Sequence, residues 1–254
     1  MGVEYKHFLI PRPNSFLPEP EQVISLLNRL VEDRWIIDPT SESFANMQFD
    51  YMTYDSFAEI TGAYAQQKRR QWISFPYPFS ANWLAKHHAQ ELILGWPVEN
   101  LAVSGLRYPL NSNQFDPSKT YYKLQLHFSP VYVYPMSGQI DPFTAPVTCA
   151  ECGEALEFWP QEGDETGGIF GSARLHLCCP RCATPFDVAR LSAVVRDGRT
   201  GEPKDVQGGA CYRFAIVVDC GKCIQAANVK VAPRLRKLCE DKLGCSFYEI
   251  GDFY

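Results

Sequence analysis

Two cysteine pairs with the same internal spacing constrain the fold of this chain more than any other feature. Cys149 and Cys152 form one C-x2-C pair, Cys179 and Cys182 form a second, and 26 residues separate the two pairs. A C-x2-C turn places two thiolates on one side of a metal ion, and Zn2+ prefers four tetrahedral sulfur or nitrogen ligands. The spacing therefore predicts a four-cysteine Zn2+ site that joins two distant turns of the chain.

The residues around the pairs indicate short β-hairpins. Gly153 directly follows the first pair and suits a tight turn, while Pro180 lies inside the second pair and also suits a turn. An acidic, glycine-rich stretch at residues 161–168 is expected to form an exposed loop between them. Over about residues 145–188 the segment resembles the zinc-ribbon family, in which two such knuckles sit on short β-hairpins.

A site with four cysteine ligands favours a structural role for the metal. Four thiolates fill the coordination shell, whereas a catalytic zinc usually keeps an open position for water. His176 and Cys178 are alternative ligands near the second pair. Cys149 and Glu151 also resemble half of a zinc deaminase motif, but Pro180 stands inside the second pair and not before it. We expect structural Zn2+, whose binding free energy contributes to folding.

The number and position of the cysteines indicate a reducing compartment and an uneven chain. All ten cysteines fall at or after residue 149, so the C-terminal part contains a feature that the N-terminal part lacks. No signal-peptide pattern is present, and no apolar run approaches the roughly 20 residues that span a bilayer. A cytoplasmic protein with reduced cysteines and no membrane partner is therefore expected. The net charge of −5 disfavours a duplex-binding protein.

Two segments near the ends of the chain share one pattern, a strand followed by an amphipathic helix and a further strand. The pattern occurs at residues 5–10, 23–31 and 35–37, and again at 212–218, 235–242 and 247–250. The helices share the motif L-x-[RK]-L-x-E-D-[RK], which indicates either pseudo-symmetry or the ordinary likeness of amphipathic helices. The chain therefore predicts an α+β fold with a mixed sheet and two βαβ-like units. Gly244 is the expected C-cap of the second helix.

These patterns predict two parts of the chain. Residues 1–143 and 189–254 form the α+β body, and residues 144–188 form the zinc ribbon inserted into it. Within the body, residues 123–128 alternate cleanly, as a strand does. His127 shares the polar face of that strand with Lys123 and Gln125, and a solvated His127 is expected.

A third C-x2-C pair, Cys220 and Cys223, follows the strand predicted at residues 212–218. In this position the pair could be a thioredoxin-type redox couple or part of a second zinc site with Cys211, Cys239 or Cys245. Ordinary reduced cysteines are the remaining alternative, and Cys239 on an apolar helix face is expected in the core.

Two further segments could bind a partner. Lys68, Arg69, Arg70 and Trp72 form the most basic run, which is either a nucleic-acid contact or a solvated helix end. Residues 75–79 together with Trp72, Trp83 and Trp96 form an aromatic, proline-rich belt, which is either a binding groove or part of the core.

The sequence favours a non-enzymatic protein that contacts another macromolecule and carries a structural zinc. A protein partner is favoured over nucleic acid because the chain is acidic overall, and an immunity-like or antitoxin-like role fits that charge. The alternatives are an enzyme with a dispersed site in the aromatic belt or at Cys220 and Cys223, and a nucleic-acid-binding zinc-ribbon protein. No G-x-S-x-G, P-loop, G-x-G-x-x-G or H-E-x-x-H motif is present.

Overall fold

The computed structural model describes residues 5–37, 52–53, 92–98, 101–111, 122–135, 147–149, 151–156, 172–174, 178–185, 192–196, 203–220 and 229–253. The two basic and aromatic segments at residues 68–72 and 75–79, together with Trp83, His176 and Cys223, lie outside these ranges. Trp96 of the predicted aromatic belt is described, and it is buried in the core.

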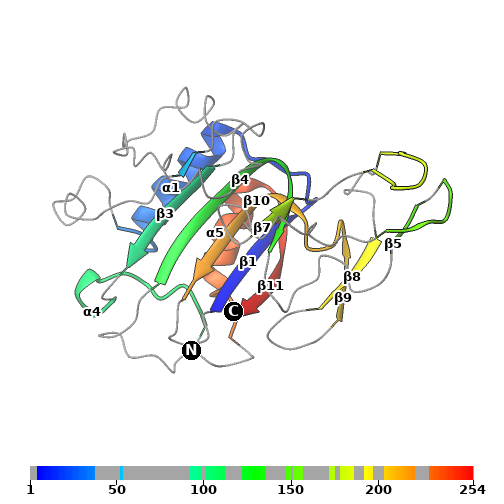
Figure 1. Ribbon diagram of the computed structural model, residues 1–254. Helices are drawn as coiled ribbons and strands as arrows, with labels where there is room; N and C mark the ends of the chain where they lie inside the picture. The colour runs from blue at the N-terminus through cyan, green and yellow to red at the C-terminus, as the bar shows by residue number, and fades with distance from the viewer. Residues whose placement is uncertain are drawn as a thin grey trace, which may run out of the picture.

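One sheet of seven strands organises the molecule (Figure 1). Its strands follow the order β11-β1-β10-β4-β3-β2, and β7 also pairs with β4. They are β1 (Tyr5–Arg12), β2 (Met52–Thr53), β3 (Leu92–Val98), β4 (Tyr122–Pro135), β7 (Ser172–Arg174), β10 (Tyr212–Asp219) and β11 (Ser246–Phe253). Two hairpins lie outside this sheet, β5 (Val147–Thr148) with β6 (Ala155–Leu156), and β8 (Ser192–Arg196) with β9 (Pro203–Gln207).

The two predicted helices are present. They are α1 (Pro20–Glu32) and α5 (Pro233–Leu243), and a short α4 (Leu101–Ser104) follows β3. Both long helices begin at a proline, whose fixed φ suits the first turn. The backbone N–H of Glu19 donates to the Gln22 side chain in a capping box. At the other end of α5, Gly244 adopts φ 68 as the predicted C-cap.

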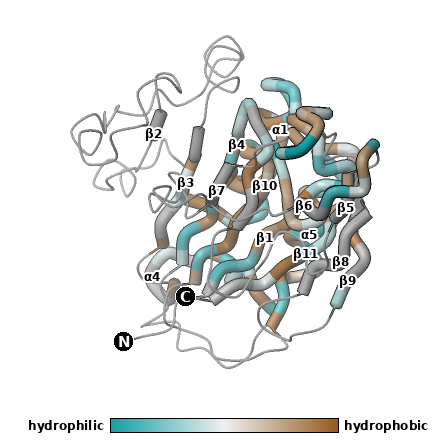
Figure 2. The backbone as a smooth tube through the Cα atoms, turned by 45° about the vertical axis from the view of Figure 1, so that its right-hand side comes forward, coloured by the Kyte–Doolittle hydropathy of each residue, from teal (hydrophilic) through white to brown (hydrophobic). Residues whose placement is uncertain are grey.

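The helices cover one face of the sheet and pack against each other (Figure 1). The apolar stripe of α1 buries Val23, Leu26, Leu27 and Leu30, and that of α5 buries Leu235, Leu238, Cys239 and Leu243. These side chains join Leu9, Leu126 and Ile216 from the central strands in one core. Each fully buried aliphatic side chain contributes about 1.5–3 kcal/mol. Figure 2 shows hydrophobic stretches within the sheet, mixed with hydrophilic ones.

Helix α5 connects two strands that run parallel but are not neighbours, and α1 lies in the chain between two other such strands. Strands β10 and β11 flank β1, which is antiparallel to both, and α5 connects them. Strands β1 and β4 likewise flank β10, and α1 lies between them in the chain. The order β11-β1-β10-β4 with two helices on one face is the interleaved β-α-β-β-α-β arrangement of ferredoxin-like folds. The segment that carries the two cysteine pairs falls between the third and fourth of these elements, β4 and β10.

Two details of the predicted fold are wrong. The sheet is not mixed, because every pair of neighbouring strands that the structure describes is antiparallel. Residues 35–37 form no strand, since the N–H groups of Trp35 and Ile36 both donate to the carbonyl of Leu30 at the end of α1. Both side chains are buried in the core, and that burial produced the strand-like pattern.

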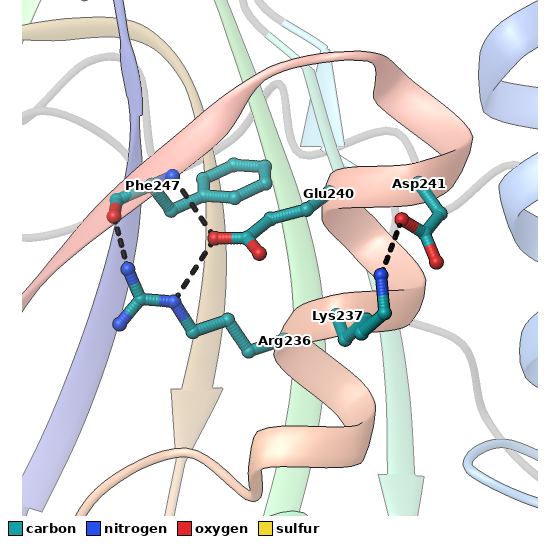
Figure 3. Close-up of polar contacts among 5 residues, drawn as sticks. All are labelled: Arg236, Lys237, Glu240, Asp241 and Phe247. Carbon is teal, nitrogen blue, oxygen red and sulfur yellow. Dashed lines mark hydrogen bonds and ion pairs between the residues drawn. The ribbon is translucent and has the colours of Figure 1, made fainter.

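Side chains of α5 satisfy backbone groups of the edge strand β11 (Figure 3). The Arg236 guanidinium donates to the carbonyl of Phe247, and the Phe247 N–H donates to Oε1 of Glu240 at 3.4 Å. Arg236 Nε also donates to the same Glu240 oxygen at 3.1 Å. Arg236 and Glu240 therefore occupy the backbone groups of Phe247 with which a further strand would otherwise pair. Their contacts protect this part of the sheet edge.

Candidate metal centre

The structure brings the four cysteines of the two predicted pairs together. The Sγ atoms of Cys149, Cys152, Cys179 and Cys182 all lie within 4.8 Å of one another. Two of the separations are 3.7 Å, between Cys149 and Cys182, and 3.6 Å, between Cys152 and Cys179. A tetrahedron with Zn–S bonds of about 2.3 Å has edges of about 3.8 Å. A disulfide needs an S–S distance of about 2.05 Å, so the spacing is that of metal ligands.

The two pairs form knuckles with the same backbone hydrogen bonds. In the first knuckle, the Gly153 N–H donates to the Cys149 carbonyl at 2.9 Å, and the Cys149 N–H donates to Glu154 at 2.8 Å. In the second, the Ala183 N–H donates to the Cys179 carbonyl, and the Cys179 N–H donates to Thr184, both at 2.9 Å. Two local turns of one design therefore present the four sulfurs.

Both knuckles close on a residue in the left-handed region. Gly153 has φ 70 and Ala183 has φ 55. Glycine adopts this conformation without penalty, whereas an L-residue with a Cβ loses roughly 1–2 kcal/mol there. The prediction that Gly153 serves a tight turn is confirmed, and the second knuckle reaches the same geometry with a strained alanine.

Each knuckle lies at the end of a short antiparallel pairing. In the first, Thr148 of β5 pairs with Ala155 of β6, and in the second, Cys178 forms an isolated bridge with Pro185. Between the knuckles, β7 pairs with β4 and links this segment to the main sheet. The four cysteines therefore lie on two turns, each next to a short antiparallel pairing.

The ligands differ in their exposure to solvent. Cys149 and Cys179, the first cysteine of each pair, are only 2% exposed, whereas Cys152 is partly buried and Cys182 is exposed. A salt bridge of 3.4 Å between Arg181 and Glu154 joins the two knuckles at the surface. Because both side chains are largely exposed, it contributes at most about 1 kcal/mol.

The thiols of Cys152 and Cys182 have pKa values that are shifted in opposite directions. The hydrogen bonds of the Thr184 hydroxyl and backbone amide lower the pKa of Cys182 to about 6. The Glu154 amide lowers the pKa of Cys152, but burial and hydrogen bonds with the other three sulfurs outweigh it and raise that pKa to about 12. A divalent cation would remove this conflict, because it stabilises all four thiolates together. The donor set therefore fits a metal ion.

The other described cysteines lie outside the cluster. Among the residues that the structure describes, the quartet is the one group of three or more metal-ligating side chains. Cys178 is exposed beside it, while Cys220, from the third pair, is buried at the end of β10. Burial raises the pKa of Cys211 and Cys239, and raises that of Cys245 to about 11, so these thiols are poor nucleophiles.

Two histidines occupy environments that the sequence did not reveal. His127 shares the predicted strand face with Lys123 and Gln125, but it is only 2% exposed, so the expected solvation is wrong. His7 is buried too, and its Nδ1 lies 3.1 Å from Oε1 of Glu249 on β11. The same carboxylate oxygen accepts a hydrogen bond from the Val231 N–H at 3.0 Å.

No known protein family, curated protein or solved structure matches the chain. Within the described residues, no helix is both long enough and apolar enough to cross a membrane.

Proposed function

We propose that this protein binds a structural Zn2+ ion through Cys149, Cys152, Cys179 and Cys182, and that the knuckles serve as a docking element for a protein partner. The observation that carries the proposal is the sulfur spacing, which matches the edge of a zinc tetrathiolate tetrahedron. The zinc ribbon of residues 144–188 is then an insertion into the ferredoxin-like body, between β4 and β10.

The ligand set supports a structural and not a catalytic role. All four positions of a tetrahedral ion would be taken by thiolates from the chain, which leaves none for water or substrate. The paired strands of β5 and β6 are two residues long each, so they provide little hydrophobic stabilisation of their own. Metal binding would supply the stability that these hairpins lack.

The surface of the knuckles favours a protein over a nucleic acid. Glu151, Pro180 and Arg181 are exposed on it, and Arg181 is paired with Glu154. Two carboxylates and one guanidinium give no excess of positive charge, whereas phosphate recognition requires such an excess. A non-enzymatic interaction role follows from a closed metal shell and an exposed, mixed-charge surface.

Two adjacent cysteines give a matched test of the metal site. Native mass spectrometry and elemental analysis of the full chain should find one Zn2+ ion in the wild type. Cys179→Ser removes a ligand and should lose the metal, whereas Cys178→Ser changes the exposed neighbour and should keep it. Equal zinc contents in the two variants would refute the assigned ligand set.

The docking role needs a separate experiment. Affinity capture with the zinc-loaded chain should retain a partner that Glu151→Arg no longer retains while keeping its zinc. Fluorescence anisotropy with labelled DNA and RNA should show no saturable binding at physiological salt. Tight, salt-dependent binding of an oligonucleotide would show that the partner is a nucleic acid and not a protein.

A further inference from the structure

Exposed basic side chains lie on the segments that join the end of α1 to the start of α5. We call them the basic patch, and they are Arg34, Arg107, Lys230 and Arg234. Arg34 directly follows the C-cap of α1, and Arg107 belongs to residues 105–111, the segment after α4. Lys230 precedes α5, and Arg234 lies in its first turn. On a chain with a net charge of −5, this local excess of positive charge calls for a reason.

Backbone hydrogen bonds bring the four positions together. At one side of residues 105–111, the Arg107 N–H donates to the Arg34 carbonyl at 2.8 Å. At the other side, the Asn111 N–H donates to the Lys230 carbonyl at 2.9 Å, and the Lys230 N–H donates to Oδ1 of Asn111 at 2.8 Å. Because four residues span at most about 14 Å of backbone, the charges follow one another closely along a continuous stretch of surface.

A buried tyrosine supports this surface from below. The hydroxyl of Tyr122, which is fully buried, lies 3.2 Å from the carbonyls of both Trp35 and Arg107. The Arg107 guanidinium lies over the ring of Trp35, 5.7 Å from its centroid. A side chain that is already held against an aromatic face loses less conformational entropy when a partner binds. The charge of Arg107 is therefore presented in a defined position.

Carboxylates of the chain do not neutralise the basic patch. Glu32 and Asp33, the acids next to Arg34 in the sequence, both pair with Arg29, at 3.0 and 2.9 Å. The first turn of α5, which contains Arg234, has no acidic residue. Within the described part of the chain, no ion pair is formed by any member of the basic patch. Their charges therefore face solvent and are available to a partner.

Local stability does not account for two of these arginines. Arg34 adopts φ 61, in the left-handed region where glycine is the usual residue after a helix. Arg234 lies at the positive end of the α5 dipole, where acidic residues are favourable and cations are not. A glycine at the first position and an acid at the second would suit the fold better, which points to a role of these side chains outside the fold.

We propose that the basic patch docks an acidic, carboxylate-rich segment of a protein partner. Three of its four members are arginines, whose planar guanidinium groups pair bidentately with carboxylates. A nucleic acid fits less well, because Trp35 is only 3% exposed beneath Arg107 and offers no face on which a base could stack. The net negative charge of the chain would also repel a polyanion longer than the patch.

The basic patch is a contact surface separate from the knuckles. Helix α4, which leads into residues 105–111, and strand β5, which leads into the first knuckle, lie on opposite sides of the molecule (Figures 1 and 2). The inference therefore does not rest on the zinc site, and its failure would leave the proposed metal binding intact.

Fluorescence anisotropy with a labelled hexaglutamate peptide and the full-length zinc-loaded protein tests the proposal. The peptide should bind saturably at low ionic strength and more weakly as salt is added. Arg34→Gly and Arg234→Met should each weaken binding roughly threefold, and the double variant roughly tenfold. Lys242→Met is the matched control, because it removes an exposed charge from the last turn of α5 and should leave the affinity unchanged.

Two further measurements separate the proposal from its alternatives. Urea unfolding should show that Arg34→Gly is at least as stable as the wild type, since glycine relieves the left-handed backbone, so lost folding cannot explain weaker binding. An oligothymidylate with the same number of charges should bind more weakly than the peptide. Absence of saturable peptide binding, equal weakening by Lys242→Met, or tighter binding of the oligonucleotide would overturn the proposal.

Discussion

The metal centre and the polar face of β4, which carries Lys123, Gln125 and His127, are assembled in opposite ways. Each knuckle places two ligands with six consecutive residues, and the backbone hydrogen bonds that close it stay within that turn. The polar face instead needs three strands that are distant in sequence, because Lys6, Lys123 and Asp219 meet only through the register of β1, β4 and β10. The first depends on local turns and a cation, whereas the second depends on the whole sheet. The two should therefore respond differently to metal, mutation and pH.

Removing the metal should separate the two regions most completely. Apparent binding free energies of structural zinc sites reach about 10–16 kcal/mol, far more than two-residue strands can replace. Excess chelator should therefore abolish the amide signals of Cys149–Gly153 and Cys179–Ala183 in NMR spectra, while far-UV circular dichroism of the sheet persists. The α+β body should still unfold cooperatively in excess chelator. Loss of that cooperativity would show that the fold of the body depends on the knuckles and would contradict the proposed arrangement.

A glycine in the body offers the converse test. Gly208 has φ 79, and a Cβ there would lie 1.8 Å from Nδ2 of the buried Asn14 side chain. Gly208→Ala therefore combines left-handed strain with displacement of a buried amide, and we expect about 3 kcal/mol of destabilisation in urea unfolding. The zinc content should stay unchanged.

Gly244→Ala is the matched control for that substitution. Gly244 has φ 68 but no atom within 4 Å of its missing Cβ, so only the backbone strain applies. We expect a loss of about 1 kcal/mol. Equal decreases in the free energy of unfolding of the two glycine variants would mean that the contact between Gly208 and Asn14 does not contribute to stability.

The buried histidine should make the stability of the body depend on pH. The pKa of His127 in the folded state is lowered, first by burial and then by Lys6 and Lys123. Below about pH 6.5 the unfolded chain binds a proton that the folded chain does not, so acid favours unfolding. The free energy of unfolding should fall by up to about 1.4 kcal/mol per pH unit between pH 6.5 and 5. Urea unfolding of wild type and His127→Gln at these pH values measures the slope.

His127→Gln is compared with the wild type by the slope of the unfolding free energy against pH, and not by its stability at one pH. His127→Gln also changes the hydrogen bonds with Gln125 and Tyr212, so it will lower stability at pH 7. Its dependence on pH should nevertheless be flatter than that of the wild type. Parallel slopes would show that a group other than His127 causes the acid sensitivity.

The contrast between the two regions also explains what the sequence could predict. Cysteine spacing predicted which four cysteines cluster because a C-x2-C turn is local, and the alternation at residues 123–128 placed Lys123, Gln125 and His127 on one face. The burial of that face was missed because it depends on how distant segments pack. The pairing of His7 with Glu249, 242 residues apart, and the insertion of β1 between β10 and β11 have no local signature. Register is decided by the collapsed sheet as a whole.

The smallest predicted effect compares the two knuckles with each other. Their hydrogen bonds match, but one closes on Gly153 and the other on Ala183, with φ 70 and φ 55. Ala183→Gly relieves left-handed strain in the zinc-bound state, but it also raises the conformational entropy of the unfolded chain. The free energy of zinc binding should therefore become more favourable by only about 0.5–1 kcal/mol. Gly153→Ala should weaken zinc binding by a similar amount, and competition with a chromogenic chelator measures both. Since no atom lies within 4 Å of a Cβ at Gly153, crowding cannot account for the loss. Weaker zinc binding in Ala183→Gly would show that the alanine stabilises the second knuckle in a way that its backbone conformation does not explain.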